Sequence, residues 1–148
     1  MVGFILVTAP GEPIRYWDQS GDFFTTINDR VNRALSELPA GVKVRGVLWH
    51  QGESDHASTD YYSEKLDDLI GNIRAKGWFA SDGVFVCGET LNSPVNERLS
   101  ALNDDFDLRT GCVSSAGLQS VGDNVHFNAE SLRQLGGRYA TKYLELTR

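Results

Sequence analysis

Short apolar runs alternate with segments of helical periodicity, and this alternation constrains the fold more than any other feature of the sequence. Four runs rich in β-branched residues lie near positions 2–8, 42–49, 83–87 and 111–115. Strands that alternate with helices are typical of an α/β protein with a parallel sheet. The sequence therefore predicts an α/β fold.

Four segments carry the apolar spacing of helices that bury one face. In the segments 24–38, 60–76 and 95–106, apolar residues recur every three or four positions. A last helix is expected after Asn128, whose side chain suits the N-cap position. These helices are expected to cover the predicted sheet.

The size and charge of the chain limit its organisation and its ligands. The chain has 148 residues, of which 41% are apolar, enough to bury the core of one domain. No repeat or linker divides it, so a single domain is expected over 1–148. The formal net charge is -6 without a run of basic residues, which argues against nucleic-acid binding. A neutral or polar small molecule is the expected partner.

The apolar run near the N-terminus is too short for a signal-peptide core or a membrane span. We therefore expect no membrane partner and a cytoplasmic protein. Cys87 and Cys112 fall in predicted strands and are expected to be buried thiols, as is usual in that compartment.

Three polar segments follow predicted strands and are the candidates for a functional site. They cover 9–14, 49–55 and 123–127. Because the carboxyl ends of parallel strands meet at one edge of a sheet, we expect these segments to lie close together.

In the last of these segments, Asp123 precedes His126 by three residues. At that spacing the carboxylate can bind the imidazole, fix its tautomer and support its positive charge during proton transfer. The alternative is that Asp123 caps a turn and His126 is an ordinary surface residue. Spacing alone does not decide between a base with its orienting partner and a simple turn.

The segment 49–55 places Gln51 and Glu53 directly after a strongly apolar run. Amide donors at a strand end can stabilise a developing oxyanion. The alternative is a capping turn, to which Ser54 and Asp55 would contribute.

A metal site is a third interpretation of this region, because His50, Glu53 and His56 are spaced by three residues. On a loop, however, this spacing does not align ligands as it does along a helix. No metal and no cofactor are therefore expected.

The motif Trp-His-Gln-Gly-Glu-Ser-Asp at 49–55, together with Asp123-x-x-His126 and the segment 135–140, resembles the SGNH hydrolase superfamily. Within it, the resemblance is to the branch of sialate O-acetylesterases and carbohydrate esterase family 6. It extends over 2–146 and includes Gly11, which is similar to the glycine loop of the family. The resemblance implies a three-layer, flavodoxin-like parallel sheet.

The resemblance also implies an activity and a role for each site residue. Gln51 would donate a side-chain N–H, and Gly11 a backbone N–H, to the oxyanion. His126 would be the general base, Asp123 its partner, and Glu53 a carboxylate that holds the loops of the site. The implied activity is that of a carboxylic-ester hydrolase acting on acetylated carbohydrate of the sialate or xylan type.

The chain departs from the family pattern at the nucleophile. A strand ending in a Gly-x-Ser turn is expected, yet no such turn precedes Trp49. Ser20 superficially echoes it but lies a dozen residues beyond the first predicted strand. Alternatively, 2–8 is itself the first strand, with Thr8 near the place of the nucleophile. An inactive remnant that binds an acylated sugar therefore stands beside the esterase interpretation.

In a flavodoxin-like sheet of order 2-1-3-4-5, the first strand is central. We therefore expect a sheet without its first strand and helix, in which 2–8 pairs directly with 42–49 or a second chain fills the gap. An exposed apolar face usually drives association, so a homodimer is expected.

Overall fold

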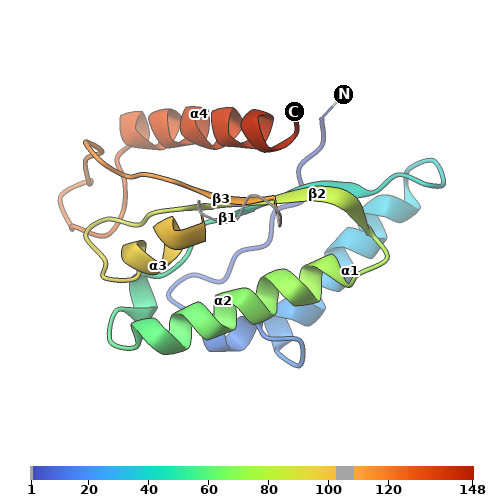
Figure 1. Cartoon of the computed structure of the whole chain (residues 1–148), viewed down its shortest axis with the longest axis horizontal. Coiled ribbons are helices and arrows are strands. Elements are labelled where there is room, and N and C mark those ends of the chain that lie inside the picture. The colour runs from blue at the N-terminus through green and yellow to red at the C-terminus, as the bar shows by residue number, and fades with distance from the viewer. Residues whose placement is uncertain (1, 103–108) are drawn as a thin grey trace.

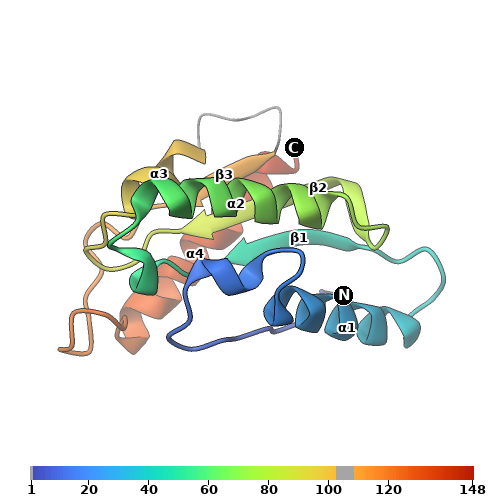
Figure 2. The same cartoon turned by 90° about the horizontal axis from the view of Figure 1, so that it is seen from below.

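The computed structural model describes residues 2–102 and 109–148, and these form a three-layer α/β fold. The central layer is a parallel sheet of β1 (Val44–Trp49), β2 (Phe79–Gly88) and β3 (Thr110–Val113), in that spatial order. Figure 1 shows α4 on one face of the sheet and α1, α2 and α3 on the other, which is the face seen in Figure 2. The predicted α/β class is confirmed.

The helices follow the periodicity of the sequence. They are α1 (Asp22–Ser36), α2 (Thr59–Arg74), α3 (Asn96–Ala101) and α4 (Ala129–Leu146), with short 3-10 turns η1 (Ile14–Trp17) and η2 (Glu53–Asp55). Asn128 is the N-cap of α4, as predicted, and accepts a hydrogen bond from the backbone N–H of Ser131 at 2.9 Å. The helix predicted over 95–106 begins as α3, while its positions 103–106 lie outside the described residues. No helix in the described part of the chain is long and apolar enough to cross a membrane.

The segment 2–8 forms no strand, so the prediction that it pairs with 42–49 is wrong. A strand needs a neighbour for its backbone groups, and this segment is held by side-chain contacts instead. Arg30 on α1 donates a hydrogen bond to the carbonyl oxygen of Leu6 at 2.6 Å, while Val7 packs against the core. In Figure 1 the segment runs from the α4 side of the sheet to the side of α1 and α2. Within the described residues β1 therefore pairs only with β2, and its other edge is open.

Two hydrophobic clusters hold the helices to the faces of the sheet. On the α2 side, Tyr62, Leu66 and Leu69 are buried against β2. The other face packs against α4 through the second cluster, which includes Val84, Val86, Leu135 and Tyr139. Cys87 and Cys112 are buried thiols at paired positions of β2 and β3, as expected.

Glycine allows α4 to approach the end of β2. A Cβ atom at Gly88 would lie 2.2 Å from the phenolic oxygen of Tyr139, far inside van der Waals contact. The ring of Tyr139 therefore occupies the space that any side chain at position 88 would need. This fit sets the position of α4 relative to the carboxyl ends of the strands.

Candidate active site

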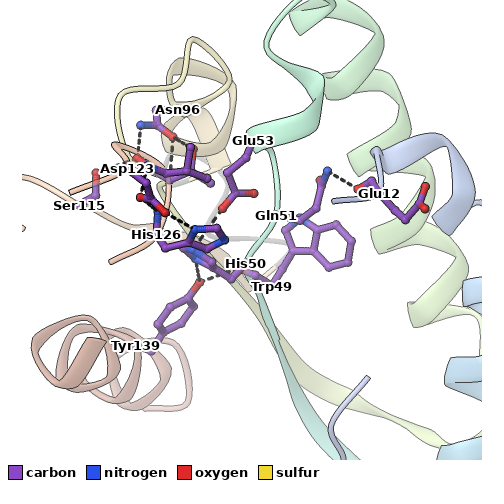
Figure 3. Close-up of polar contacts among 12 residues, drawn as sticks. Glu12, Trp49, His50, Gln51, Glu53, Asn96, Ser115, Asp123, His126 and Tyr139 are labelled. Atoms are coloured by element: carbon purple, nitrogen blue, oxygen red, sulfur yellow. Dashed lines mark hydrogen bonds and ion pairs between the residues drawn. The ribbon is translucent and has the colours of Figure 1, made fainter. Parts of the chain in front are cut away.

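The polar segments that follow the three strands meet at one edge of the sheet, as the sequence predicts. His50 and Gln51 follow β1, Ser115 follows β3, and the loop that carries Asp123 and His126 leads into α4. Figure 3 shows Asp123, His126 and His50 together, with Glu53 beside the two imidazoles, whereas the Gln51 amide points toward Glu12.

Asp123 and His126 form a hydrogen-bonded pair. Oδ2 of Asp123 lies 2.6 Å from Nδ1 of His126, and Oδ1 accepts the backbone N–H groups of Val125 and His126, both at 2.9 Å. The hydrogen bond that Asp123 accepts from the imidazole raises the pKa of His126. The same bond, together with the two backbone N–H groups, lowers the pKa of Asp123. In the described part of the chain, Nε2 of His126 has no hydrogen-bond partner. This arrangement fits a base that takes a proton at Nε2.

The loop before α4 holds this pair in place by its own hydrogen bonds. Gly122 and Asn124 both have positive φ, and their N–H groups donate to the hydroxyl oxygen of Ser120 at 2.7 and 3.2 Å. Phe127, which is buried, fixes the end of the loop against the core. Asp123 thus caps a turn and also binds the imidazole of His126.

Gln51 is buried at the end of β1 and uses both hydrogens of its amide. Nε2 lies 2.5 Å from Oδ2 of Asp55 and 3.2 Å from the carbonyl oxygen of Glu12. Asp55 also accepts the backbone N–H of Ile14 at 3.0 Å. The sequence predicted Asp55 as part of a capping turn. In the structure Asp55 is buried, and its contact with Ile14 joins residues 41 positions apart.

Gly11 lies beside Gln51, on the loop that Asp55 holds. Its φ of 75° is in the left-handed region that favours glycine. Its carbonyl oxygen accepts a hydrogen bond from the hydroxyl of Ser54 at 3.0 Å. Its N–H has no partner among the described residues. The predicted proximity of the segments 9–14 and 49–55 is therefore confirmed.

His50 directly follows β1 and belongs to the motif at 49–55. Its Nε2 is 3.8 Å from a carboxylate oxygen of Glu53, and its ring is 5.8 Å from that of Phe127. Burial lowers the pKa of His50, an effect that the charge of Glu53 opposes. The pKa of His50 therefore lies below that of His126.

Tyr139 ties α4 to this region. Its hydroxyl donates to the carbonyl oxygen of Trp49 at 2.6 Å and lies 3.4 Å from Nδ1 of His50. The periodicity of α4 marks Tyr139 as a core residue, and its polar role was not predicted. Trp49 itself is core, with its indole N–H 3.2 Å from the hydroxyl oxygen of Tyr62.

The hydroxyl of Ser20 is engaged with Asp18 at 3.0 Å and makes no hydrogen bond with His126. The three residues of the metal interpretation do not converge either. His56 turns its Nδ1 to the carbonyl oxygen of Glu53 at 3.2 Å, and the described residues contain no group of three potential ligands around one point.

The described residues thus form a parallel α/β sheet that carries a carboxylate-bound imidazole and a buried amide at its carboxyl edge, where the functional sites of such sheets lie. A family profile described as "Carbohydrate esterase, sialic acid-specific acetylesterase" matches residues 1–145. The chain belongs to this family. The resemblance found in the sequence is therefore confirmed.

Two comparisons lead to Arabidopsis thaliana. The chain is 26% identical to "Probable carbohydrate esterase At4g34215" over 148 residues, which cover 97% of the chain and 56% of that protein. The X-ray structure of the Arabidopsis thaliana protein AT4G34215 superposes with a TM-score of 0.72 at 25% identity, over 91% of the chain and 57% of that structure. The chain thus spans just over half the length of the relative it matches.

Proposed function

We propose that the chain is an O-acetylesterase domain that hydrolyses acetyl esters of carbohydrates. The observation that carries the proposal is the 2.6 Å contact between Asp123 and His126, whose Nε2 is left available. Family membership supports an acetylated sugar as the substrate. His126 is the general base, Asp123 its partner, and Glu53 the carboxylate that borders both imidazoles.

In the proposed reaction His126 transfers one proton, and one bond at the acetyl carbon forms while another breaks. His126 takes a proton from the attacking hydroxyl group at Nε2, and the attacking oxygen forms a bond with the acetyl carbon. The tetrahedral intermediate collapses with cleavage of the bond to the sugar oxygen, which receives the proton back from His126. Among the described residues, no serine or threonine hydroxyl is hydrogen-bonded to His126. The attacking group in this proposal is therefore a water molecule.

The oxyanion is stabilised by Gln51 and Gly11 in this proposal. The N–H of Gly11 is available among the described residues. Gln51 must release one of its two hydrogen bonds, and the longer one, to Glu12 at 3.2 Å, is the one proposed to break. Donors aimed at an oxyanion typically contribute about a hundredfold or more to the rate.

The proposal is tested by measuring acetate release from acetylated xylo-oligosaccharides. Wild-type protein should release acetate above the rate without protein, and His126→Ala should abolish the excess. His56→Ala is the matched control, because it removes an exposed imidazole of the same loops and should leave the rate unchanged. Equal rates for wild type and His126→Ala would contradict the proposal.

A second candidate function is the binding of an acylated sugar without turnover. It is favoured by the hydrogen bonds of the Gln51 Nε2 group to Asp55 and Glu12, which occupy both of its N–H hydrogens. In that case an acetylated sugar should bind to wild type and to His126→Ala alike, and neither should release acetate.

We also propose that two copies associate through the open edge of β1. Leu48 lies on this strand and is 49% exposed, and Phe4 and Leu6 are exposed in the nearby N-terminal segment. Sedimentation should show a dimer that Leu48→Lys dissociates. Leu38→Lys, at an equally exposed leucine beyond the end of α1, is the control. A wild-type monomer at all concentrations would contradict this association.

A further inference from the structure

A groove of about 550 Å³ is lined in part by the loop that carries Asp123 and His126. It runs between the loop after β2 and the loop that joins β3 to α4, and its polar lining comes from both. These lining residues include Asn92, Ser115, Gln119, Ser120 and Asn124. Gly122 and Asn124, which flank Asp123 in the sequence, both line the groove, so the proposed base His126 and the groove share one loop.

The groove offers hydrogen-bonding groups that the protein does not itself use. In the described part of the chain, the side-chain amides of Asn92 and Asn124 form no hydrogen bond. The oxygen of Ser120 accepts two backbone N–H groups, which leaves its own O–H as a donor. Amides and hydroxyls that can both donate and accept match the hydroxyl groups of a sugar.

Backbone conformation holds both amides at the groove. Asn92 and Asn124 have φ values of 51° and 61°, in the left-handed region that asparagine tolerates better than most residues. Their placement is therefore set by the turns themselves and does not depend on a bound ligand.

None of the residues that line the groove is charged. The neighbouring charged side chains form hydrogen bonds with backbone groups in the walls of the groove. Arg138 donates to the carbonyl oxygens of Ser114 and Ala116, at 2.5 and 3.0 Å, and Glu89 accepts the backbone N–H of Ser115 at 2.7 Å. A carboxylate or phosphate in the groove would therefore meet no cation among the lining residues.

We propose that this groove binds the sugar part of the substrate and that it selects uncharged sugars over acidic ones. The inference rests on the proposed function for the identity of the ligand, and it adds where the sugar lies and which class of sugar is accepted. Asn92 and Asn124 bind the sugar through hydrogen bonds to neighbouring hydroxyl groups, and the absence of a cation among the lining residues disfavours acidic sugars.

The test is a titration of ¹⁵N-labelled full-length chain with xylobiose and, separately, with N-acetylneuraminic acid. Xylobiose should shift the backbone resonances of Gly117, Gly122 and Asn124, whereas N-acetylneuraminic acid should leave them unchanged. Both sugars lack an O-acetyl ester, so the measurement does not depend on turnover. Failure of the esterase proposal therefore leaves this test intact.

Two variants remove the amides without straining the turns. Asn92→Gly and Asn124→Gly keep the positive φ, and each should weaken xylobiose binding by about fivefold, the usual effect of one hydrogen bond. Asn32→Ala, on the exposed face of α1, is the control and should bind like wild type. Shifts that map outside the groove, equal shifts by the acidic sugar, or unchanged binding in both glycine variants would each overturn the proposal.

Discussion

Nε2 of Gln51 lies 2.5 Å from Oδ2 of Asp55, and this pair joins the loop after β1 to the loop that carries Gly11. The same carboxylate oxygen accepts the backbone N–H of Ile14 at 3.0 Å. Asp55 therefore fixes the distance between the two proposed oxyanion donors, Gln51 and Gly11.

Replacement of Asp55 should cost stability, because it leaves buried donors without a partner. We expect Asp55→Ala to lower the free energy of unfolding by about 2 kcal/mol, since the amide of Gln51 and the N–H of Ile14 lose their acceptor. Urea denaturation measures the change. Ser54→Ala is the control, because it removes an exposed hydrogen bond to Gly11; an equal loss in both variants would contradict the role of Asp55.

The two imidazoles of the site should titrate on opposite sides of the ordinary value of 6.5. The hydrogen bond to Asp123 stabilises the protonated form of His126, so its pKa lies above that value. Burial disfavours the protonated form of His50, so its pKa lies below that value. A pH titration of the imidazole resonances by NMR measures both.

Asp123→Asn is expected to lower the pKa of His126 and to leave the pKa of His50 unchanged. The direction of the His126 pKa shift also determines how its interaction with Asp123 affects stability at each pH. The interaction of His126 with Asp123 stabilises the fold fully below the unfolded pKa of histidine, and this contribution is lost as the pH rises through the folded pKa. A pKa of His126 at or below 6.5 in the wild type would contradict the pairing.

The close packing of Tyr139 on Gly88 predicts that a single methyl group is not tolerated there. Gly88→Ala should lower the free energy of unfolding by about 2 kcal/mol, because its Cβ would overlap the phenol. Gly136→Ala is the matched control, because a Cβ at this position in α4 meets no atom within 4 Å. Its free energy of unfolding should rise by about 1 kcal/mol, since alanine favours a helix more than glycine does. Thermal or urea unfolding separates the two outcomes, and a neutral Gly88→Ala would show that α4 can move away.

The regular elements could be predicted because their signals are local. The apolar spacing of α1, α2 and α4 and the N-cap at Asn128 are visible within a few residues of sequence. The segment 2–8 shows the limit of such reasoning. Its residues suit a strand, but a strand also needs a neighbour, and the contacts of Leu6 and Val7 with distant parts of the chain replace that neighbour.

The contacts of the candidate site likewise include some between residues close in the sequence, which could be predicted, and some between distant residues, which could not. Asp123 and His126 are three residues apart, so their pairing could be expected from sequence. The hydroxyl of Tyr139 and the ring of His50 come from positions 89 residues apart, and only the packing of α4 on the sheet brings them together. Asp55 was missed as a site residue for the same reason, since its partner Ile14 lies 41 positions away.

The most direct test of the proposed function is the pH dependence of p-nitrophenyl acetate hydrolysis by wild type, His126→Ala and Asp123→Asn. In serine proteases that lack their triad, about a thousandfold acceleration over water persists, so a weak but measurable rate is expected without an activated serine. Wild-type activity should rise with pH through a midpoint above 6.5, the ordinary value for histidine. Asp123→Asn should shift this midpoint downward, and His126→Ala should remove it. A wild-type rate that equals that of His126→Ala at every pH would contradict the account.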